Sequence, residues 1–371
     1  MAGGGAPIED LLIEARRRIH LPTHADVSAR IAAANLSYGL ARVLAAVRTL
    51  VPDADVSYRA SPDFTITRTV KRWKGGFAYG GETVLETGGV EVVIPELRPN
   101  ACGTLVGRLE KPITTDQMIR RASALRAEST DMVWDYSRRN HFINLYFSRE
   151  RGEQVFVIHG CPARIRLDTE DGPGIDANKS AYWKSHIEEV PSPLGGLGVL
   201  VGENARRFWT NFRRCELLSL ADRTATAERI FGPFEEVQNV SHVGMSSPCS
   251  YYHGCHVDGA PGSLYPVLTK PGAPVYLVEA TRDGDRGKAR LLPHGTGYSL
   301  DFPEPLREEM DPDQLRPIFL LGEPDRGGQQ VYGDVSSVPF AYREPGLVTD
   351  WQDQGLLSIR ETLIPLVTAK L

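Results

Sequence analysis

Glycine and proline interrupt this sequence at short intervals, which limits the length of any regular element. The chain of 371 residues contains 36 glycines and 26 prolines. Both residue types favour turns and end helices or strands, so the pattern predicts many short elements joined by loops. A hydrophobic content of 41% is still enough for a large buried core. This profile is that of an ordinary globular chain and excludes disordered, collagen-like and coiled-coil proteins.

Hydrophobic residues recur at helical spacing in four segments. The predicted helices are residues 8–19, a segment that Asp26 can cap and that ends before Pro52, residues 114–127 and residues 202–221. A further helix followed by a last strand is expected over residues 347–371. The first 66 residues are therefore expected to form a helical N-terminal extension.

The intervening segments carry short β-branched and aliphatic runs, such as residues 90–94 and 104–107. Residues 141–148 and 154–159 flank a charged turn and predict a β-hairpin. A long loop is expected over residues 168–197, and alternating strands and turns up to residue 322. No repeat or linker divides the chain, so we expect one mixed α+β domain, with residues 67–371 as its core, in which helices flank central β-sheets.

The sequence shows neither a membrane-spanning segment nor a secretory signal, so we expect a cytoplasmic protein without membrane contact. No apolar run approaches the roughly 18 residues of a spanning helix, and residues 1–5 lack the features of a secretory signal. An odd number of cysteines suggests thiols or metal ligands rather than disulfides; they are Cys102, Cys161, Cys215, Cys249 and Cys255. The net charge of −5 argues against a nucleic-acid surface over the whole molecule and leaves room for a local basic patch.

One cysteine and four histidines stand at or near the ends of expected strands. They are Cys102, His141, His159, His242 and His294. Thiolate and imidazole groups are good ligands for borderline divalent metals. Each histidine taken alone also fits a hydrogen-bonded structural or surface role, and spacing alone does not make the five converge.

Three other patterns have competing interpretations. Residues 249–256 have the composition of a zinc knuckle, but the Cys-x5-Cys spacing matches no common finger. Residues 195–202 are glycine-rich but lack the Gly-Lys-Ser/Thr ending of a phosphate loop, so we expect a loop entering the next helix. Paired arginines fit either phosphate contacts or solvated helix faces; the pairs begin at Arg120, Arg138, Arg206 and Arg213.

Read in order, these stretches resemble the RtcB family of GTP-dependent RNA-splicing ligases, from roughly residue 70 to the C-terminus. Cys102-Gly103 resembles the end of Asp-x-Gly-Cys-Gly, residues 140–143 resemble Asn-His-Phe-Ile-Glu, and residues 157–159 resemble the start of Ile-His-Ser-Gly-Ser-Arg. Residues 205–214 resemble the helix before the next histidine, His242. Residues 294–298 resemble His-Gly-Ala-Gly-Arg, and residues 339–370 follow the C-terminal pattern that ends in lysine.

The resemblance implies an RtcB-like domain with a metal-lined cleft and a specific set of site residues. It implies Mn²⁺, or another divalent metal such as Zn²⁺, bound by Cys102, His141, His159 and His242. His294 would attack the α-phosphate of GTP and form a histidine–GMP intermediate. The implied nucleotide-binding residues are Asn140, Gly295, Gly297, Tyr342 and Lys370. The implied reaction joins RNA 3′-phosphate or 2′,3′-cyclic phosphate ends to 5′-hydroxyl ends.

Several positions depart from the family pattern and remove charge or polar contacts from the implied site. Pro99 or Asn100 stands where the family has a metal-binding Asp, Asn144 replaces a Glu, and Tyr298 replaces an Arg. Residues 257–258 and 271–273 likewise lack the family's basic residues and serine. These departures leave three alternatives open: a small phosphorylated or carboxylate metabolite as acceptor, a metalloenzyme without guanylylation in which His294 is a general acid or base, or a non-catalytic nucleotide-binding protein. The sequence predicts no oligomeric state.

Overall fold

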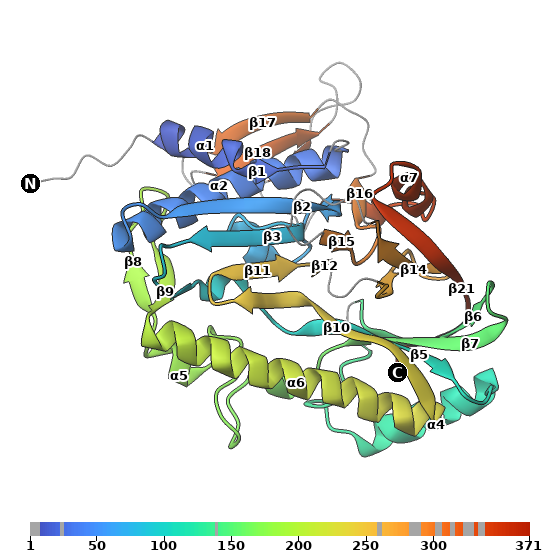
Figure 1. The fold of residues 1–371 in the computed structure, drawn as a ribbon. Coiled ribbons are helices and arrows are strands. Elements are labelled where there is room, and N and C mark those ends of the chain that lie inside the picture. Colours follow the sequence, from blue (N-terminus) through green and yellow to red (C-terminus); the bar gives the residue numbers. More distant parts are fainter. Residues whose placement is uncertain are drawn as a thin grey trace, which may run out of the picture.

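Eleven strands form one large sheet that runs through most of the molecule (Figure 1). The computed structural model describes residues 8–22, 26–137, 140–257, 262–281, 291–300, 306–311, 316–321, 330–332 and 338–371. In spatial order the strands are β1 (Ile19–His20), β2 (Asp55–Thr65), β3 (Tyr79–Glu86), β11 (Ser250–His253), β10 (Phe234–Ser247), β5 (Cys102–Leu109), β7 (Glu153–Gly160), β6 (Phe142–Ser148), β21 (Leu357–Ala369), β14 (Val275–Ala280) and β13 (Tyr265–Val267). Only β1 and β2 pair in parallel, and all other neighbours in this sheet are antiparallel.

Four small sheets surround the large one. They are β4 (Val92–Val93) with β9 (Leu197–Val201) and β8 (Glu188–Val190), β12 (Cys255–Val257) with β15 (Leu291–Pro293), β16 (Tyr298–Leu300) with β20 (Phe340–Tyr342), and β17 (Leu306–Asp311) with β18 (Arg316–Leu321) and β19 (Gln330–Tyr332). The pair β12 and β15 matters for the site, because His294 directly follows β15.

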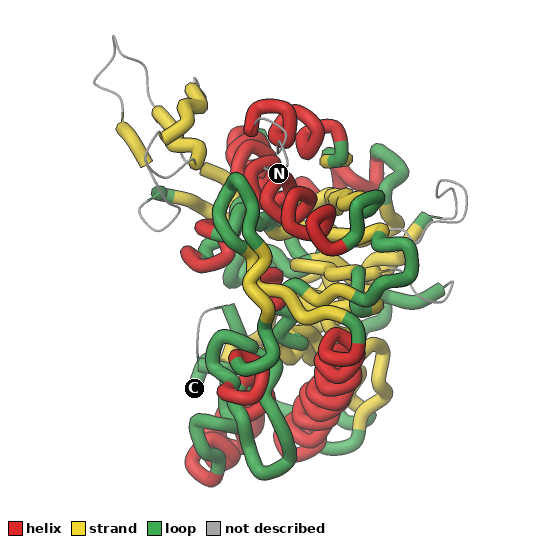
Figure 2. The backbone as a smooth tube through the Cα atoms, turned by 90° about the vertical axis from the view of Figure 1, so that its left-hand side faces the viewer, coloured by secondary structure: helices red, strands yellow, loops and turns green. Residues whose placement is uncertain are grey.

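The long helices lie on two opposite sides of the strands (Figures 1 and 2). On one side are α1 (Ile8–Arg17) and α2 (Val27–Leu50), and on the other α4 (Thr115–Glu128) and α6 (Glu203–Phe231). Shorter helices are α3 (Val70–Lys74), α5 (Ala181–Lys184) and α7 (Leu347–Asp353), with 3₁₀ turns at Pro95–Leu97 and Ala163–Arg166. The architecture is thus a single mixed α+β domain.

Local sequence explains where the long helices begin and end. Asp26 caps α2 by accepting the Ala29 N–H at 2.9 Å. Thr114 and Gln117 form a reciprocal capping box at the start of α4. The segment expected to end at residue 221 continues to Phe231, because apolar residues still recur at helical spacing, and it ends before Gly232, whose φ is 81°.

The N-terminal 66 residues form two helices as expected, but residues 55–65 are not helical. They form β2, where inward and outward positions alternate as in a strand. Helix α2 is mostly buried and shares its apolar cluster with Phe208 and Phe212 of α6. The described part of this segment, residues 8–22 and 26–66, therefore belongs to the main core.

Most other expected elements are confirmed. Strands β6 and β7 form the predicted hairpin, and α7 followed by β21 closes the chain. Residues 168–197 are largely loop, interrupted by α5 and β8 and ending at the first residue of β9. Arg138, Arg139, Asp258 and parts of the strand region up to residue 322 lie outside the described residues. In the described part of the chain no helix is long and apolar enough to cross a membrane.

Candidate metal centre

The cysteine and three of the candidate histidines meet at one edge of the large sheet. Cys102 is the first residue of β5, His159 is the penultimate residue of β7, and His141 directly precedes β6. His242 lies in β10. These four strands are neighbours in the sheet, so residues that are far apart in sequence become adjacent.

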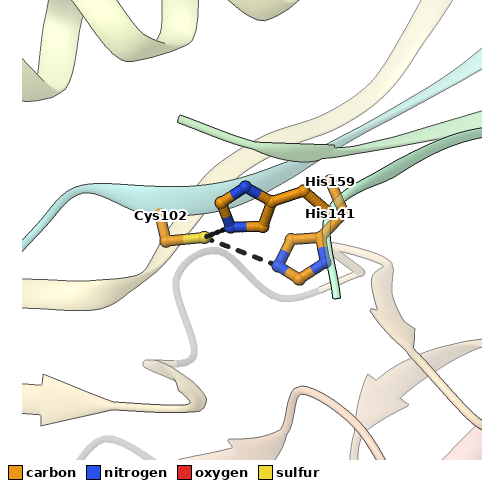
Figure 3. A group of neighbouring side chains, drawn as sticks. All are labelled: Cys102, His141 and His159. Atoms are coloured by element: carbon orange, nitrogen blue, oxygen red, sulfur yellow. Dashed lines mark hydrogen bonds between the residues drawn. The ribbon is translucent and has the colours of Figure 1, made fainter. Parts of the chain in front are cut away.

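The donor atoms of Cys102, His141 and His159 face one another (Figure 3). The Sγ atom of Cys102 lies 3.2 Å from Nε2 of His141 and 3.5 Å from Nε2 of His159. Nε2 of His159 is in turn 3.3 Å from Nε2 of His242. All four side chains are buried. Cys102, His141 and His159 together form a group that could hold a divalent metal ion.

Hydrogen bonds at Nδ1, the ring nitrogen remote from Cys102, orient the imidazole rings of His141 and His159. Nδ1 of His141 lies 2.8 Å from the carboxylate Oδ2 of Asp135, and Nδ1 of His159 lies 3.0 Å from the carbonyl oxygen of Asn140. Carboxylate and carbonyl oxygens only accept, so both Nδ1 atoms carry a proton, and the Nε2 atoms, which hold the lone pair in the neutral rings, face Cys102. Burial lowers the pKa of His159 well below its usual value, so that ring stays neutral.

A β-bulge brings His242 beside the group of Cys102, His141 and His159, of which it is not a member. The pairing of β10 with β5 runs from Ser241 opposite Gly103 to Val243 opposite Cys102, which leaves His242 as the extra residue. A bulge redirects a side chain, and here the ring of His242 lies 5.0 Å, centroid to centroid, from that of His159. Nδ1 of His242 is buried without a hydrogen-bond partner, and burial lowers the pKa of this ring as well.

The backbone before Cys102 is held in an unusual conformation. Ala101 has a φ of 52°, in the left-handed region that costs an L-residue about 1–2 kcal/mol. The Ser219 hydroxyl donates to the Ala101 carbonyl at 3.0 Å, and Asn100 Oδ1 accepts the Cys102 N–H at 3.0 Å. These contacts fix the direction in which the Cys102 side chain leaves the strand. They also use the oxygen of Asn100, one of the two candidates for the position of the family's Asp.

A second group, Asp135, His141 and Cys161, also brings its ligand atoms within 4.8 Å of one another. However, Arg166 Nη2 lies 2.9 Å from Asp135 Oδ2 and 2.8 Å from Cys161 Sγ. A hydrogen bond with Cys102 and the charge of Arg166 lower the pKa of Cys161 to about 5. This group therefore already holds a cation, the guanidinium of Arg166.

His294 lies beside the metal group and is oriented by Asp63. Its ring centroid is 4.9 Å from that of His242. Nδ1 of His294 lies 2.7 Å from Oδ2 of Asp63, and the same oxygen accepts the backbone N–H groups of His294 and Gly295 at 3.2 and 3.3 Å. Because a carboxylate only accepts, Nδ1 carries a proton, and in the neutral ring the lone pair is on Nε2.

Asp63 is not among the site residues that the sequence predicts. The signal for it was an acidic residue at an inward position of the strand pattern in β2, where its side chain is fully buried. A buried carboxylate in a strand is rare without a partner, and here the partner is His294.

The other expected nucleotide-binding residues fall into two places. Tyr342 pairs with Tyr298 across β20 and β16, with ring centroids 5.1 Å apart, just after Gly295 and Gly297. Asn140 and Lys370 are both exposed. They lie at the same edge of the sheet as the metal group, since Ala369 pairs with Ile143. The structure thus places one set after His294 and one set beside His141.

The zinc-knuckle pattern does not assemble. Cys249 Sγ lies 3.7 Å from the Val90 carbonyl, His253 Nε2 lies 2.5 Å from the Leu97 carbonyl, and Cys255 Sγ lies 3.4 Å from the Gly81 carbonyl. Among the described residues these side chains form no metal-ligand group.

The described arginine pairs of α6 are engaged in ion pairs or carbonyl contacts. Arg206 pairs with Glu91, Arg213 lies 2.8 Å from Glu216, and Arg214 lies 2.7 Å from the Asp171 carbonyl. These contacts favour the helix-face interpretation over phosphate binding for this helix.

No protein-family model matches this chain. A comparison with curated proteins likewise found none with significant sequence similarity.

Proposed function

We propose that this chain is a divergent, RtcB-like, metal-dependent nucleotidyltransferase or ligase. In this proposal His294 takes a guanylate from GTP and passes it to an RNA 3′-phosphate end, which is then joined to a 5′-hydroxyl end. One observation carries the proposal: Nδ1 of His294 lies 2.7 Å from Oδ2 of Asp63, which directs Nε2 away from this carboxylate, and the ring lies 4.9 Å from that of His242, beside the metal group. An oriented nucleophile beside a metal site is what nucleotidyl transfer requires.

The residues at the sheet edge fit a divalent cation. Three donor atoms from Cys102, His141 and His159 face one another. Three protein ligands leave a further position open, as in catalytic metal sites. The soft thiolate and two imidazoles favour Zn²⁺ over the Mn²⁺ that the resemblance implies, since Mn²⁺ prefers oxygen donors. When bound, such a cation would neutralise charge on the phosphoryl oxygens.

The chain's own residues account for the first chemical step. Nε2 of His294 attacks the α-phosphorus, a bond to nitrogen forms, and pyrophosphate leaves. The imidazole becomes positively charged as this bond forms, and the buried carboxylate of Asp63 stabilises that charge through the Nδ1 hydrogen bond. Asp63 therefore orients the ring and compensates its charge without transferring a proton.

The second step returns His294 to its starting state. An oxygen of the acceptor phosphate attacks the same phosphorus and displaces the neutral imidazole. Residues at the two edges of the site are available for the nucleotide and the acceptor: Tyr342 with Tyr298 after the nucleophile, and Asn140 with Lys370 beside His141.

A second candidate function is metal-assisted hydrolysis of a small phosphorylated or carboxylate compound, with His294 as general base. It is favoured by the contacts of the residues that depart from the family pattern. Tyr298 packs on Tyr342 where an arginine is expected, and the Asn100 oxygen is bound to the Cys102 N–H. A polyanion such as RNA requires several cationic contacts, and these two positions supply none.

Mass spectrometry of the intact protein separates these functions. Wild type, His294→Ala and the control His20→Ala, at an exposed histidine, are incubated with Mn²⁺ or Zn²⁺ and with GTP or ATP. We expect a mass gain of one GMP in wild type and in the control, and none in His294→Ala. Metal-loaded protein without adduct would contradict the transferase and support hydrolysis. Protein with neither metal nor adduct, but with a GTP-dependent rise in melting temperature, would indicate a non-catalytic nucleotide-binding protein.

A further inference from the structure

Cys161 has no part in the proposed reaction, yet it lies against the metal ligand Cys102. Strands β5 and β7 are antiparallel, and their last paired residues at this edge are Gly103 and Gly160. If this register is continued by one position, past the end of β7, it sets Cys102 opposite Cys161. Side chains two residues apart share a face of a strand, so Cys161 lies on the face of His159, and Cys102 lies on the face of Thr104, which pairs with His159.

Side-chain contacts agree with this register. Both thiols lie against the same imidazole: Cys102 Sγ is 3.2 Å from Nε2 of His141, and Cys161 Sγ lies within 4.8 Å of a ring nitrogen of His141. Both are reduced and buried. Directly opposed residues of antiparallel strands have Cα atoms about 4.5–5.5 Å apart, which is inside the range of about 4.4–6.8 Å that a disulfide spans. The Arg166 guanidinium, 2.8 Å from Cys161 Sγ, adds the kind of cationic contact found at reactive cysteines.

The other three cysteines have different surroundings. Cys215 Sγ lies 3.8 Å from Arg214 Nη2, Cys249 Sγ lies 3.6 Å from Thr87 Oγ1, and Cys255 Sγ lies 3.4 Å from the Gly81 carbonyl. Cys215 is buried and next to an arginine, so it offers a matched control for Cys161.

We propose that Cys102 and Cys161 form a disulfide when the protein meets a peroxide, and that this bond removes the metal. Hydrogen peroxide transfers one oxygen to the Cys161 sulfur, giving a sulfenic acid and water. The Cys102 sulfur then attacks that sulfur, the S–O bond breaks and a second water leaves. Two thiols have lost two electrons and two protons, and the peroxide has gained them; a dithiol reductant reverses the change.

The consequence for the metal follows from the ligand count. In the disulfide the Cys102 sulfur is no longer a thiolate, so the group of Cys102, His141 and His159 is reduced to two imidazoles. Conversely, a metal bound to Cys102 withholds that thiolate from the sulfenic acid. Oxidation and metal binding therefore compete for one sulfur atom.

The test uses the full chain and needs no nucleotide. Metal-free and zinc-loaded wild type are treated with hydrogen peroxide, blocked with N-ethylmaleimide, digested and analysed by peptide mass spectrometry. We expect a linked peptide pair containing Cys102 and Cys161, formed more slowly in the zinc-loaded protein. Zinc binding should be lost with the formation of this link and should return after dithiothreitol.

Variants decide whether Cys161 is responsible. Cys161→Ser should still bind zinc and keep it after the same peroxide exposure, whereas Cys215→Ser should behave as wild type. If serine beside Arg166 disturbs folding, Cys161→Ala replaces it. Equal zinc loss from wild type and both Cys161 variants, or oxidation of Cys102 to a sulfinic acid without a linked peptide, would overturn the proposal. None of these readouts depends on His294, so a failure here and a failure of guanylylation are distinguishable.

Discussion

Asp63 and His294 are 231 positions apart in the sequence, yet Oδ2 of Asp63 lies 2.7 Å from Nδ1 of His294. The same oxygen accepts two backbone N–H groups, those of His294 and Gly295. The carboxylate is fully buried, and these three donors compensate its charge in place of water. This arrangement ties the orientation of the ring to the backbone that carries it.

The first prediction concerns Asp63→Asn. The amide can present its NH₂ group to Nδ1, which favours the tautomer whose Nε2 carries the proton and has no lone pair. Covalent nucleotide labelling should fall by about 10²–10⁴-fold, while metal content stays at the wild-type level. Asp53→Asn makes the same chemical change at an exposed turn and should label normally. Undiminished labelling of Asp63→Asn would show that Asp63 does not set the tautomer.

The second prediction concerns Asp135→Asn, which acts on the metal through His141. Asp135 holds the Nδ1 proton of His141 at 2.8 Å, and removing its charge makes the imidazole a weaker ligand. Zinc affinity, measured by competition with a chromophoric chelator, should fall by about 10–100-fold. Asp171→Asn, at an exposed loop position, should bind zinc as wild type does. Equal affinities for the two variants would remove Asp135 from the metal centre.

The third prediction separates backbone strain from crowding around His294. Gly254 has a φ of 64°, and a Cβ there would lie 2.1 Å from Tyr79 Cδ1 and 3.0 Å from His294 Cε1. Gly88 has a similar φ of 59° with nothing within 4 Å of an added Cβ. Gly254→Ala should therefore lose about 1–3 kcal/mol more unfolding free energy than Gly88→Ala in urea titrations. It should also lose nucleotide labelling, which Gly88→Ala keeps.

The fourth prediction is a pH dependence of stability. Burial, with the charge of Arg72, lowers the pKa of His253 to about 3, whereas an unfolded histidine titrates near about 6.5. Between these values the unfolded chain binds more protons, so the unfolding free energy decreases as the pH falls. The contribution of His253 approaches about 1.4 kcal/mol per pH unit. It is fully present above about pH 6.5 and is lost progressively toward about pH 3.

The check on this prediction is His253→Gln, whose amide can still donate to the Leu97 carbonyl. In chelator-treated protein, urea titrations from pH 7 to pH 4 should give a shallower decline for the variant than for wild type. Parallel declines would mean that His253 does not contribute to acid sensitivity.

Local patterns predicted much of the fold and part of the site. The hairpin of β6 and β7 follows from two β-like runs around a charged turn, and the chain order of these strands brings His141 and His159 together. Features that depend on contacts between distant parts of the chain could not be predicted from local sequence patterns. The bulge that redirects His242 depends on the register between β10 and β5, and the role of Asp63 depends on a contact across most of the chain. The helical prediction for residues 55–65 was wrong. The segment was counted as part of a helical N-terminal extension, but it forms β2, a strand of the large sheet.

The order of the ligands along the chain has a consequence for biosynthesis. Cys102 lies in β5, His141 directly before β6 and His159 in β7, and β7 pairs with both β5 and β6. A chain emerging from the ribosome completes this unit well before His242 and His294 are made, because synthesis proceeds from the N-terminus. Metal capture can then precede completion of the nucleophilic half. A metal supplied during translation and one supplied to the finished protein would thus meet different folding states of the same three ligands.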